Sequence, residues 1–192
     1  MSWRCHTCGV EHSETPTCFG YEAPWRLLVP DFEFAQRVEL SPDVCIVDEG
    51  TFFIRGHLQI PILGNSAPLQ FSVWSSLSER SFEHMGERWE SPERSTDPPY
   101  FGWLSTNIAV YSFNNHLKLS VQSRAPGETP RFTLEPSDHP LSIDQHHGIS
   151  TERWHELVHL LMHSQSPGII VPERSLEKKV SPLSWIRRLF GA

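Results

Sequence analysis

Two strand-like segments lie close together in the chain, at 52–62 (FFIRGHLQIPI) and 71–77 (FSVWSSL). Both are rich in β-branched and aromatic residues, which favour β-strands. The residues between them include Gly64-Asn65-Ser66-Ala67-Pro68, a combination typical of a turn. The sequence therefore predicts that the two segments pair as a hairpin.

Further short strands and a few helices are predicted along the rest of the first 163 residues. Strands are expected from Cys45 onward and at 100–106, 117–124 and 131–135, and one or two short helices within 25–40. The pattern Ser76-x-x-Glu79 is typical of a helix start, because the two side chains can cap each other's backbone N–H groups. The helix that follows would carry Phe82, Met85 and Trp89 on one side.

A last helix is expected at Thr151–His163. At 100° per residue, Trp154, Leu157, Val158 and Leu161 form its apolar stripe, and the histidines lie on the opposite side. Together these elements predict an α+β fold. We expect a mainly antiparallel sheet with a few helices packed on it and an N-terminal zinc-knuckle-like segment at residues 1–20.

The chain is expected to divide at about residue 163 into a single α+β domain, 1–163, and a C-terminal tail. Residues 164–168 have the composition of a linker. Large apolar residues then alternate with two arginines between 183 and 190, which predicts a short amphipathic segment that folds back onto the body.

Charge is unevenly distributed along the chain. The formal net charge is −7, but residues 1–163 carry 11 basic and 21 acidic side chains, whereas residues 164–192 have a net charge of +3. An acidic body repels phosphate backbones, which argues against nucleic acid as a ligand. It attracts a basic protein and speeds the encounter with it.

The sequence contains no apolar stretch of about eighteen residues that predicts a membrane span. Its first residues, MSWRCH, lack the basic start and apolar core of a secretory signal. We therefore expect a cytoplasmic protein. In a reducing compartment, clustered cysteines favour metal binding over disulfides.

Several strings of residues, in order from the N-terminus to about residue 163, resemble a bacterial family known as domain of unknown function 2199. They are Cys5-x-x-Cys8-Gly9-x-x-His12, 43–48 (DVCIVD), 52–61 (FFIRGHLQIP), 73–79 (VWSSLSE), 98–105 (PPYFGWLS) and 134–141 (LEPSDHPL). The resemblance implies no activity and no catalytic residues. Small bacterial families of this kind include immunity proteins, which neutralise a toxin by binding it; this is an analogy at the level of the family.

A zinc site is predicted near the N-terminus. Cys5 and Cys8 have the spacing that lets two thiolates meet one ion, and His12 can reach the same ion. Cys45 is the preferred fourth ligand because it lies in a string shared with the family; Cys18 and then His6 are the alternatives. Four protein ligands would make this zinc structural, and free thiols at the terminus are the competing interpretation.

The segment His155-Glu156-Leu157-Val158-His159 matches the H-E-x-x-H motif of zinc proteases. A third ligand is missing, because His163 follows four residues after His159. Three ligands along a straight helix at this spacing would spread over about 12 Å. The pattern therefore favours a solvated polar helix face, with a zinc-dependent hydrolase as the alternative.

The leading hypothesis is a non-catalytic binding protein, an immunity-type inhibitor of a bacterial toxin such as a nuclease, whose basic cleft an acidic protein would complement. The hydrolase and a structural protein without a toxin partner are the alternatives. The partner surface is expected in the acidic loop 87–100, with the turn at 113–116 as second choice. Its proposed contact residues are Glu87, Glu90, Glu93, Asp97 and Tyr100, beside Trp89 as an aromatic anchor.

Overall fold

The computed structural model describes residues 3–4, 9, 11–12, 15–112, 114, 116–163 and 169–170. The strands are β1 (Trp3–Arg4), β2 (Glu11–His12), β3 (Cys18–Tyr21), β4 (Val38–Leu40), β5 (Val44–Val47), β6 (Thr51–Ile60), β7 (Leu69–Leu77), β8 (Tyr100–Leu104), β9 (Lys118–Gln122), β10 (Arg131–Leu134) and β11 (Ile169–Ile170). The helices are α1 (Phe34–Arg37), α2 (Glu79–Glu87), α3 (Pro140–His147) and α4 (Thr151–His163), and the short 3₁₀ helices are η1 (Pro24–Leu27), η2 (Asp31–Glu33) and η3 (Pro92–Thr96).

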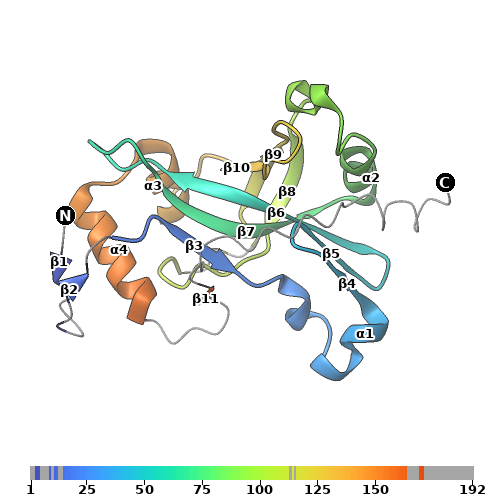
Figure 1. Cartoon of the computed structure of the whole chain (residues 1–192), viewed down its shortest axis with the longest axis horizontal. Helices are drawn as coiled ribbons and strands as arrows, with labels where there is room; N and C mark the ends of the chain where they lie inside the picture. Colours follow the sequence, from blue (N-terminus) through green and yellow to red (C-terminus); the bar gives the residue numbers. More distant parts are fainter. Residues whose placement is uncertain are drawn as a thin grey trace.

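The predicted hairpin forms the centre of the fold (Figure 1). β6 and β7 are antiparallel along their whole length, with Phe52 opposite Leu77 and Ile60 opposite Leu69. Toward the end of β6 the side chains alternate, so that Leu58 and Ile60 are buried while the intervening polar residues are partly exposed. This alternation is the period of a strand with one face in the core.

The hairpin closes into a five-stranded barrel. β7, β8, β9 and β10 pair with one another in antiparallel order, and β10 then pairs with β6 in parallel. Four antiparallel steps leave the first and last strands pointing the same way, so this last pairing has to be parallel. An idealised Cβ on Gly56 of β6 would lie only 2.1 Å from the ring of Phe132, so the absence of a side chain there makes room for that ring.

Further strands extend the sheet on both sides of the barrel. β3 adds to β7 in parallel, and β5 and β4 add to β6 in antiparallel order. β5 is buried on both faces. Val44 and Ile46 face the main core, whereas Cys45 and Val47 face a second, smaller apolar cluster that includes Trp25 and Trp74.

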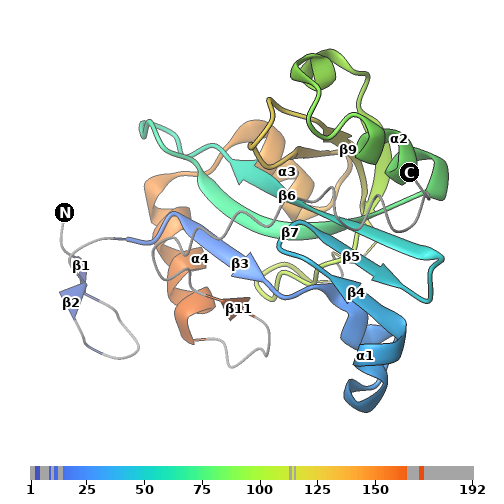
Figure 2. The same ribbon diagram turned by 45° about the vertical axis from the view of Figure 1, so that its right-hand side comes forward.

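The helices cover different parts of this sheet. α3 and α4 lie together at the end of the molecule nearest the N-terminus, and α1 and α2 lie toward the opposite end (Figures 1 and 2). α4 buries Trp154, Leu157, Val158 and Leu161 in the main core, as predicted. α2 buries Phe82 and Met85, and Trp89 just beyond it is also buried, again as predicted.

The structure corrects two local expectations. The N-cap of α2 is Ser78, whose side chain accepts a hydrogen bond from the backbone N–H of Ser81, and Ser76 remains within β7. α3, at Pro140–His147, was not among the helices that the sequence predicts. The predicted amphipathic segment at 183–190 lies outside the described residues.

The α+β class is confirmed. Within the part of the chain that the structure describes, no helix is long and apolar enough to cross a membrane.

Candidate functional site

A cavity of about 580 Å³, here termed the aromatic groove, opens beside the second apolar cluster. Its walls come from the segment that follows β3, from α1, from the β4–β5 turn and from the middle of β6 and β7. They are formed by Tyr21, Glu22, Ala23, Trp25, Arg26, Asp31, Phe34, Leu40, Ser41, Pro42, Arg55 and Trp74. Four of these residues are aromatic, Tyr21, Trp25, Phe34 and Trp74, and they make this cavity mainly apolar.

Local structure fixes these aromatic rings. The ring of Trp25 lies 4.6 Å from that of Phe34, measured between centroids, and Arg26 stacks over Trp25 at 4.5 Å. Trp74 is held from β7, where its indole N–H donates a 3.1 Å hydrogen bond to the carbonyl of Tyr21. The groove is therefore a preformed surface.

Charged groups at the groove are largely paired with one another. Arg26 binds Glu22 and Asp31, with N–O distances of 2.6 Å and 3.1 Å. Arg55 donates from Nη2 to Asp43 at 2.9 Å, but its Nε–H is buried and has no hydrogen-bond partner in the described residues. A buried donor without an acceptor is costly and rare.

Exposed apolar side chains gather on the segments that border the groove. Phe32 is 84% exposed, Leu27 76%, Leu28 49% and Leu40 46%. Single exposed apolar residues are ordinary, whereas a group of them beside an apolar cavity is typical of an interaction site. Residues 22–55 also carry seven carboxylates and three arginines, a formal net charge of −4.

The acidic loop predicted as the partner surface is only partly available. Glu87, Glu90 and Glu93 are exposed, but Asp97 is bound to Arg88 at 2.5 Å and its side chain is 13% exposed. The Tyr100 hydroxyl and His84 Nδ1 are 2.8 Å apart.

Trp89 is buried, as the apolar stripe of α2 predicts, so it is not available as the aromatic anchor of a partner surface. Its ring packs 4.7 Å from the guanidinium of Arg94, which the sequence did not single out. Arg94 is 2% exposed and donates to the carbonyls of Trp89, Arg124, Ala125 and Glu128. Burial lowers the pKa of this arginine. All four acceptors are backbone carbonyl groups. The sequence therefore contains no charged partner residue that would have identified Arg94.

Two of the predicted zinc ligands, His12 and Cys45, belong to strands that lie far apart. Figures 1 and 2 place β2, which carries His12, at the opposite end of the molecule from β5, which carries Cys45. The Cys45 thiol is buried in the second apolar cluster, and this burial raises its pKa to about 12. Without a metal ion, a thiol in such surroundings stays protonated.

Cys5 and Cys8 lie outside the described residues, so zinc binding through them stays a prediction. Cys18, the second choice for the fourth ligand, begins β3 and is partly exposed. Gln70 Nε2 lies 3.6 Å from its sulfur. Within the described residues, no group of three or more His, Cys, Asp or Glu side chains could hold a metal ion.

The histidines of α4 lie on the predicted helix face. The ring of His155 contacts that of Trp154 at 5.2 Å, and the rings of His159 and His163 are 5.1 Å apart. Glu156, the expected general base of the hydrolase alternative, accepts a 2.6 Å hydrogen bond from Arg153. Among the described residues, the structure adds no third metal ligand to this pair of histidines.

The family comparison gave one match. A model of the family described as "Uncharacterized protein conserved in bacteria (DUF2199)" matches residues 4–149. Neither the curated proteins nor the solved structures gave a match. The matched region begins within β1 and ends just after α3, and so includes the whole barrel and the aromatic groove. Since it also covers most of the chain, the protein belongs to this bacterial family.

Proposed function

We propose that this protein acts by binding another protein, as an immunity-type inhibitor of a bacterial toxin. The observation that supports this proposal is the aromatic groove, together with the exposed Leu27 and Phe32, which follow the lining residues Arg26 and Asp31 in the chain. Protein interfaces concentrate their binding energy in a few apolar and aromatic anchors that fill pockets. A preformed apolar cavity with apolar side chains around it is suited to such an anchor.

The charge around the groove favours a basic partner. Residues 22–55 have a net charge of −4, and the exposed carboxylates Glu87, Glu90 and Glu93 add to the negative field of the body. Charge complementarity of this kind accelerates association and selects the partner. Nuclease toxins carry basic clefts for nucleic acid, so a nuclease is the toxin class that this surface would complement.

The binding role is preferred to the zinc hydrolase because of how α4 is built. Glu156 is bound to Arg153, and the described residues bring no third ligand to His155 and His159. The proposal therefore assigns these side chains to the polar face of the helix.

A pull-down with the full chain as bait tests the proposal. Wild-type protein should capture a basic protein from the source bacterium and inhibit its activity. The double variant Leu27→Ser, Phe32→Ser should lose both effects, because the two exposed apolar contacts are removed. A matched control, Leu63→Ser with Leu160→Ser, changes exposed leucines outside the groove and should keep both effects. Equal capture by the groove variant, or a captured protein whose activity is unchanged, would refute the proposal.

We also propose a structural zinc held by Cys5, Cys8 and His12, with Cys18 in place of Cys45 as the fourth ligand. Cys18 is partly exposed, whereas Cys45 is enclosed by apolar side chains. Elemental analysis of protein purified without chelator should find about one zinc per chain, since four protein ligands complete a tetrahedral site. The double variant Cys5→Ser, Cys8→Ser should lose the metal and Cys45→Ala should retain it. Zinc that disappears in Cys45→Ala would restore the original assignment.

A further inference from the structure

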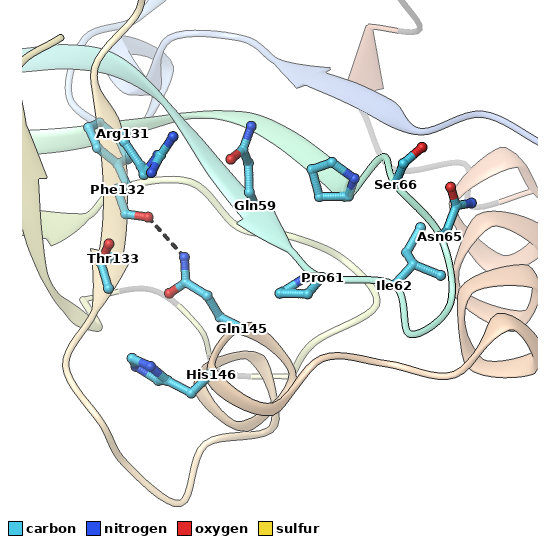
Figure 3. A pocket seen from close by; sticks show the side chains of 11 residues that line it. Gln59, Pro61, Ile62, Asn65, Ser66, Arg131, Phe132, Thr133, Gln145 and His146 are labelled. Carbon is cyan, nitrogen blue, oxygen red and sulfur yellow. Dashed lines mark hydrogen bonds between the residues drawn. The ribbon is translucent and has the colours of Figure 1, made fainter.

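A second cavity, of about 320 Å³, lies where β6 ends, beside β10, α3 and the turn that leads to β7. Figure 3 shows Arg131 at one end and Asn65 and Ser66 at the other, with Gln59 and Pro61 between them. It lies on a different part of the barrel from the aromatic groove and shares no lining residue with it.

One wall of this cavity is held rigidly. Gln145 of α3 donates from Nε2 to the carbonyl of Phe132 at 2.8 Å, and its Oε1 accepts from the backbone N–H of Leu134 at 2.8 Å (Figure 3). His146 Nε2 lies 2.9 Å from the carbonyl of Leu134. Both side chains tie the helix to β10, so the cavity is part of the folded barrel.

Arg131 is the side chain that gives the cavity its character. Among the arginines whose side chains the structure describes, between residues 15 and 163, Arg80 and Arg131 bind neither a carboxylate nor a carbonyl group; the others are paired. Arg131 lines the cavity, and none of the eleven residues around the cavity is acidic. The chain has a formal net charge of −7, so this local excess of positive charge would favour an anion at the cavity over the rest of the surface.

The remaining polar groups also suit an anion. The Oδ1 atom of Asn65 accepts from the N–H of Ala67 at 3.2 Å, which leaves the amide N–H₂ available to donate. Ser66 and Thr133 add hydroxyl groups. The side chains of Pro61 and Phe132 add apolar surface, which would contact a carbon skeleton rather than a bare ion.

We propose that this cavity binds a small organic anion, whose carboxylate or phosphate group pairs with Arg131. The planar guanidinium donates two parallel hydrogen bonds to such a group, which gives both affinity and orientation. Carboxylates and phosphate esters share this chemistry, and the probes below distinguish them.

An NMR titration of the full chain tests the proposal. Benzoate and phenyl phosphate are the probes, and neutral benzamide is the control ligand with the same ring. At least one of the anions should cause saturable shifts of the backbone amides of Gln59, Asn65, Ser66 and Arg131, and benzamide should not. The anion with the stronger effect identifies the preferred head group.

Two variants complete the test. Arg131→Gln should weaken binding about tenfold or more, because the charged hydrogen bonds are lost. Arg80→Gln removes an unpaired arginine that does not line the cavity and should leave binding unchanged. Unchanged far-UV circular dichroism would show that Arg131→Gln still folds. No saturable shift with either anion, equal binding of benzamide, or equal affinity in Arg131→Gln would overturn the proposal.

Discussion

At the scale of single residues, close packing inside the barrel depends on Gly56. A Cβ there would lie well within the contact distance of the Phe132 ring, so any side chain forces the ring or the strand to move. The sequence shows only a glycine inside a strand pattern. This predicts that another group lies close to the backbone there, but it does not identify that group. The residue that approaches lies 76 positions away in β10, a contact that only the closed barrel creates.

Gly56→Ala is predicted to destabilise the protein by about 1–3 kcal/mol, the usual cost of overpacking a core. Gly50→Ala is a suitable control, since the added Cβ would meet only an ordinary contact at 3.6 Å. In a Phe132→Leu background the cost of Gly56→Ala should shrink, because the smaller side chain leaves room. Chemical denaturation of the four proteins measures this coupling; strictly additive costs would contradict it.

Arg94 is predicted to stabilise the loop between α2 and β8. Arg94→Met should cost about 1–3 kcal/mol or more, because buried carbonyl groups lose their donor. Arg94→Lys should also destabilise, since an ammonium group lacks the planar array of donors. Thermal unfolding against the exposed control Arg80→Met provides the measurement, and a silent Arg94→Lys would mean that the hydrogen bonds to the carbonyls carry little energy.

Cys45 should react slowly with thiol reagents. Its burial raises the pKa to about 12, so the reactive thiolate is scarce at pH 8 and the sulfur is inaccessible. In a Cys5→Ser, Cys8→Ser, Cys18→Ser variant, the one remaining thiol should resist iodoacetamide until denaturant is added. Fast labelling of the native variant at pH 8 would show that Cys45 is not in the core.

At the scale of elements, the predictions that rest on local periodic patterns are correct. Pairings between segments that are distant in the sequence could not be predicted in this way. The β6–β7 hairpin and the buried stripe of α4 follow from local spacing, and the structure confirms both. The start of α2 was misplaced by two residues, since β7 continues to Leu77, where it pairs with Phe52. The parallel pairings of β3 with β7 and of β10 with β6 join segments far apart in the sequence, which no local pattern reveals.

The same distinction applies to the candidate sites. The sequence predicts a partner surface in the acidic loop 87–100. In the structure, Trp89 of this loop is buried and Asp97 forms an ion pair with Arg88. The aromatic groove joins Trp25 and Phe34 to Trp74, which lies in a strand 40 residues further along the chain from Phe34. The available signal in the sequence was the apolar residues between 27 and 32, of which Leu27, Leu28 and Phe32 are exposed in the structure and Val29 is buried.

The two sides of α4 are predicted to differ in their effect on stability. Trp154 is buried and its indole N–H donates to the carbonyl of Pro16 at 3.2 Å, so Trp154→Ala should cost about 3–5 kcal/mol. His155→Ala changes the partly exposed face and should cost less than about 0.5 kcal/mol. Urea denaturation compares the two variants, and a large cost for His155→Ala would reveal a structural or metal-binding role for this face.

At the scale of the whole molecule, charge and apolar contact are predicted to affect binding in different ways. Reversal of Glu87, Glu90 and Glu93 to lysine should slow association with a basic partner and weaken its salt dependence, because these exposed carboxylates act at long range. Asp97 is left unchanged, since its pairing with Arg88 belongs to the fold. Stopped-flow association rates at two salt concentrations make the comparison; the dissociation rate should stay the same. An association rate equal to that of the wild type at low salt would contradict this role.

The central claim is that the partner protein binds at the aromatic groove. Hydrogen–deuterium exchange tests this claim most directly. The full chain would be compared alone and in complex with the basic protein that it captures. Binding at the groove predicts increased protection of backbone amides in 22–42, around Trp25, Phe32 and Phe34, and at 73–75 beside Trp74. Protection confined to 87–100, with unchanged exchange in 22–42, would contradict the account and return the interface to the acidic loop.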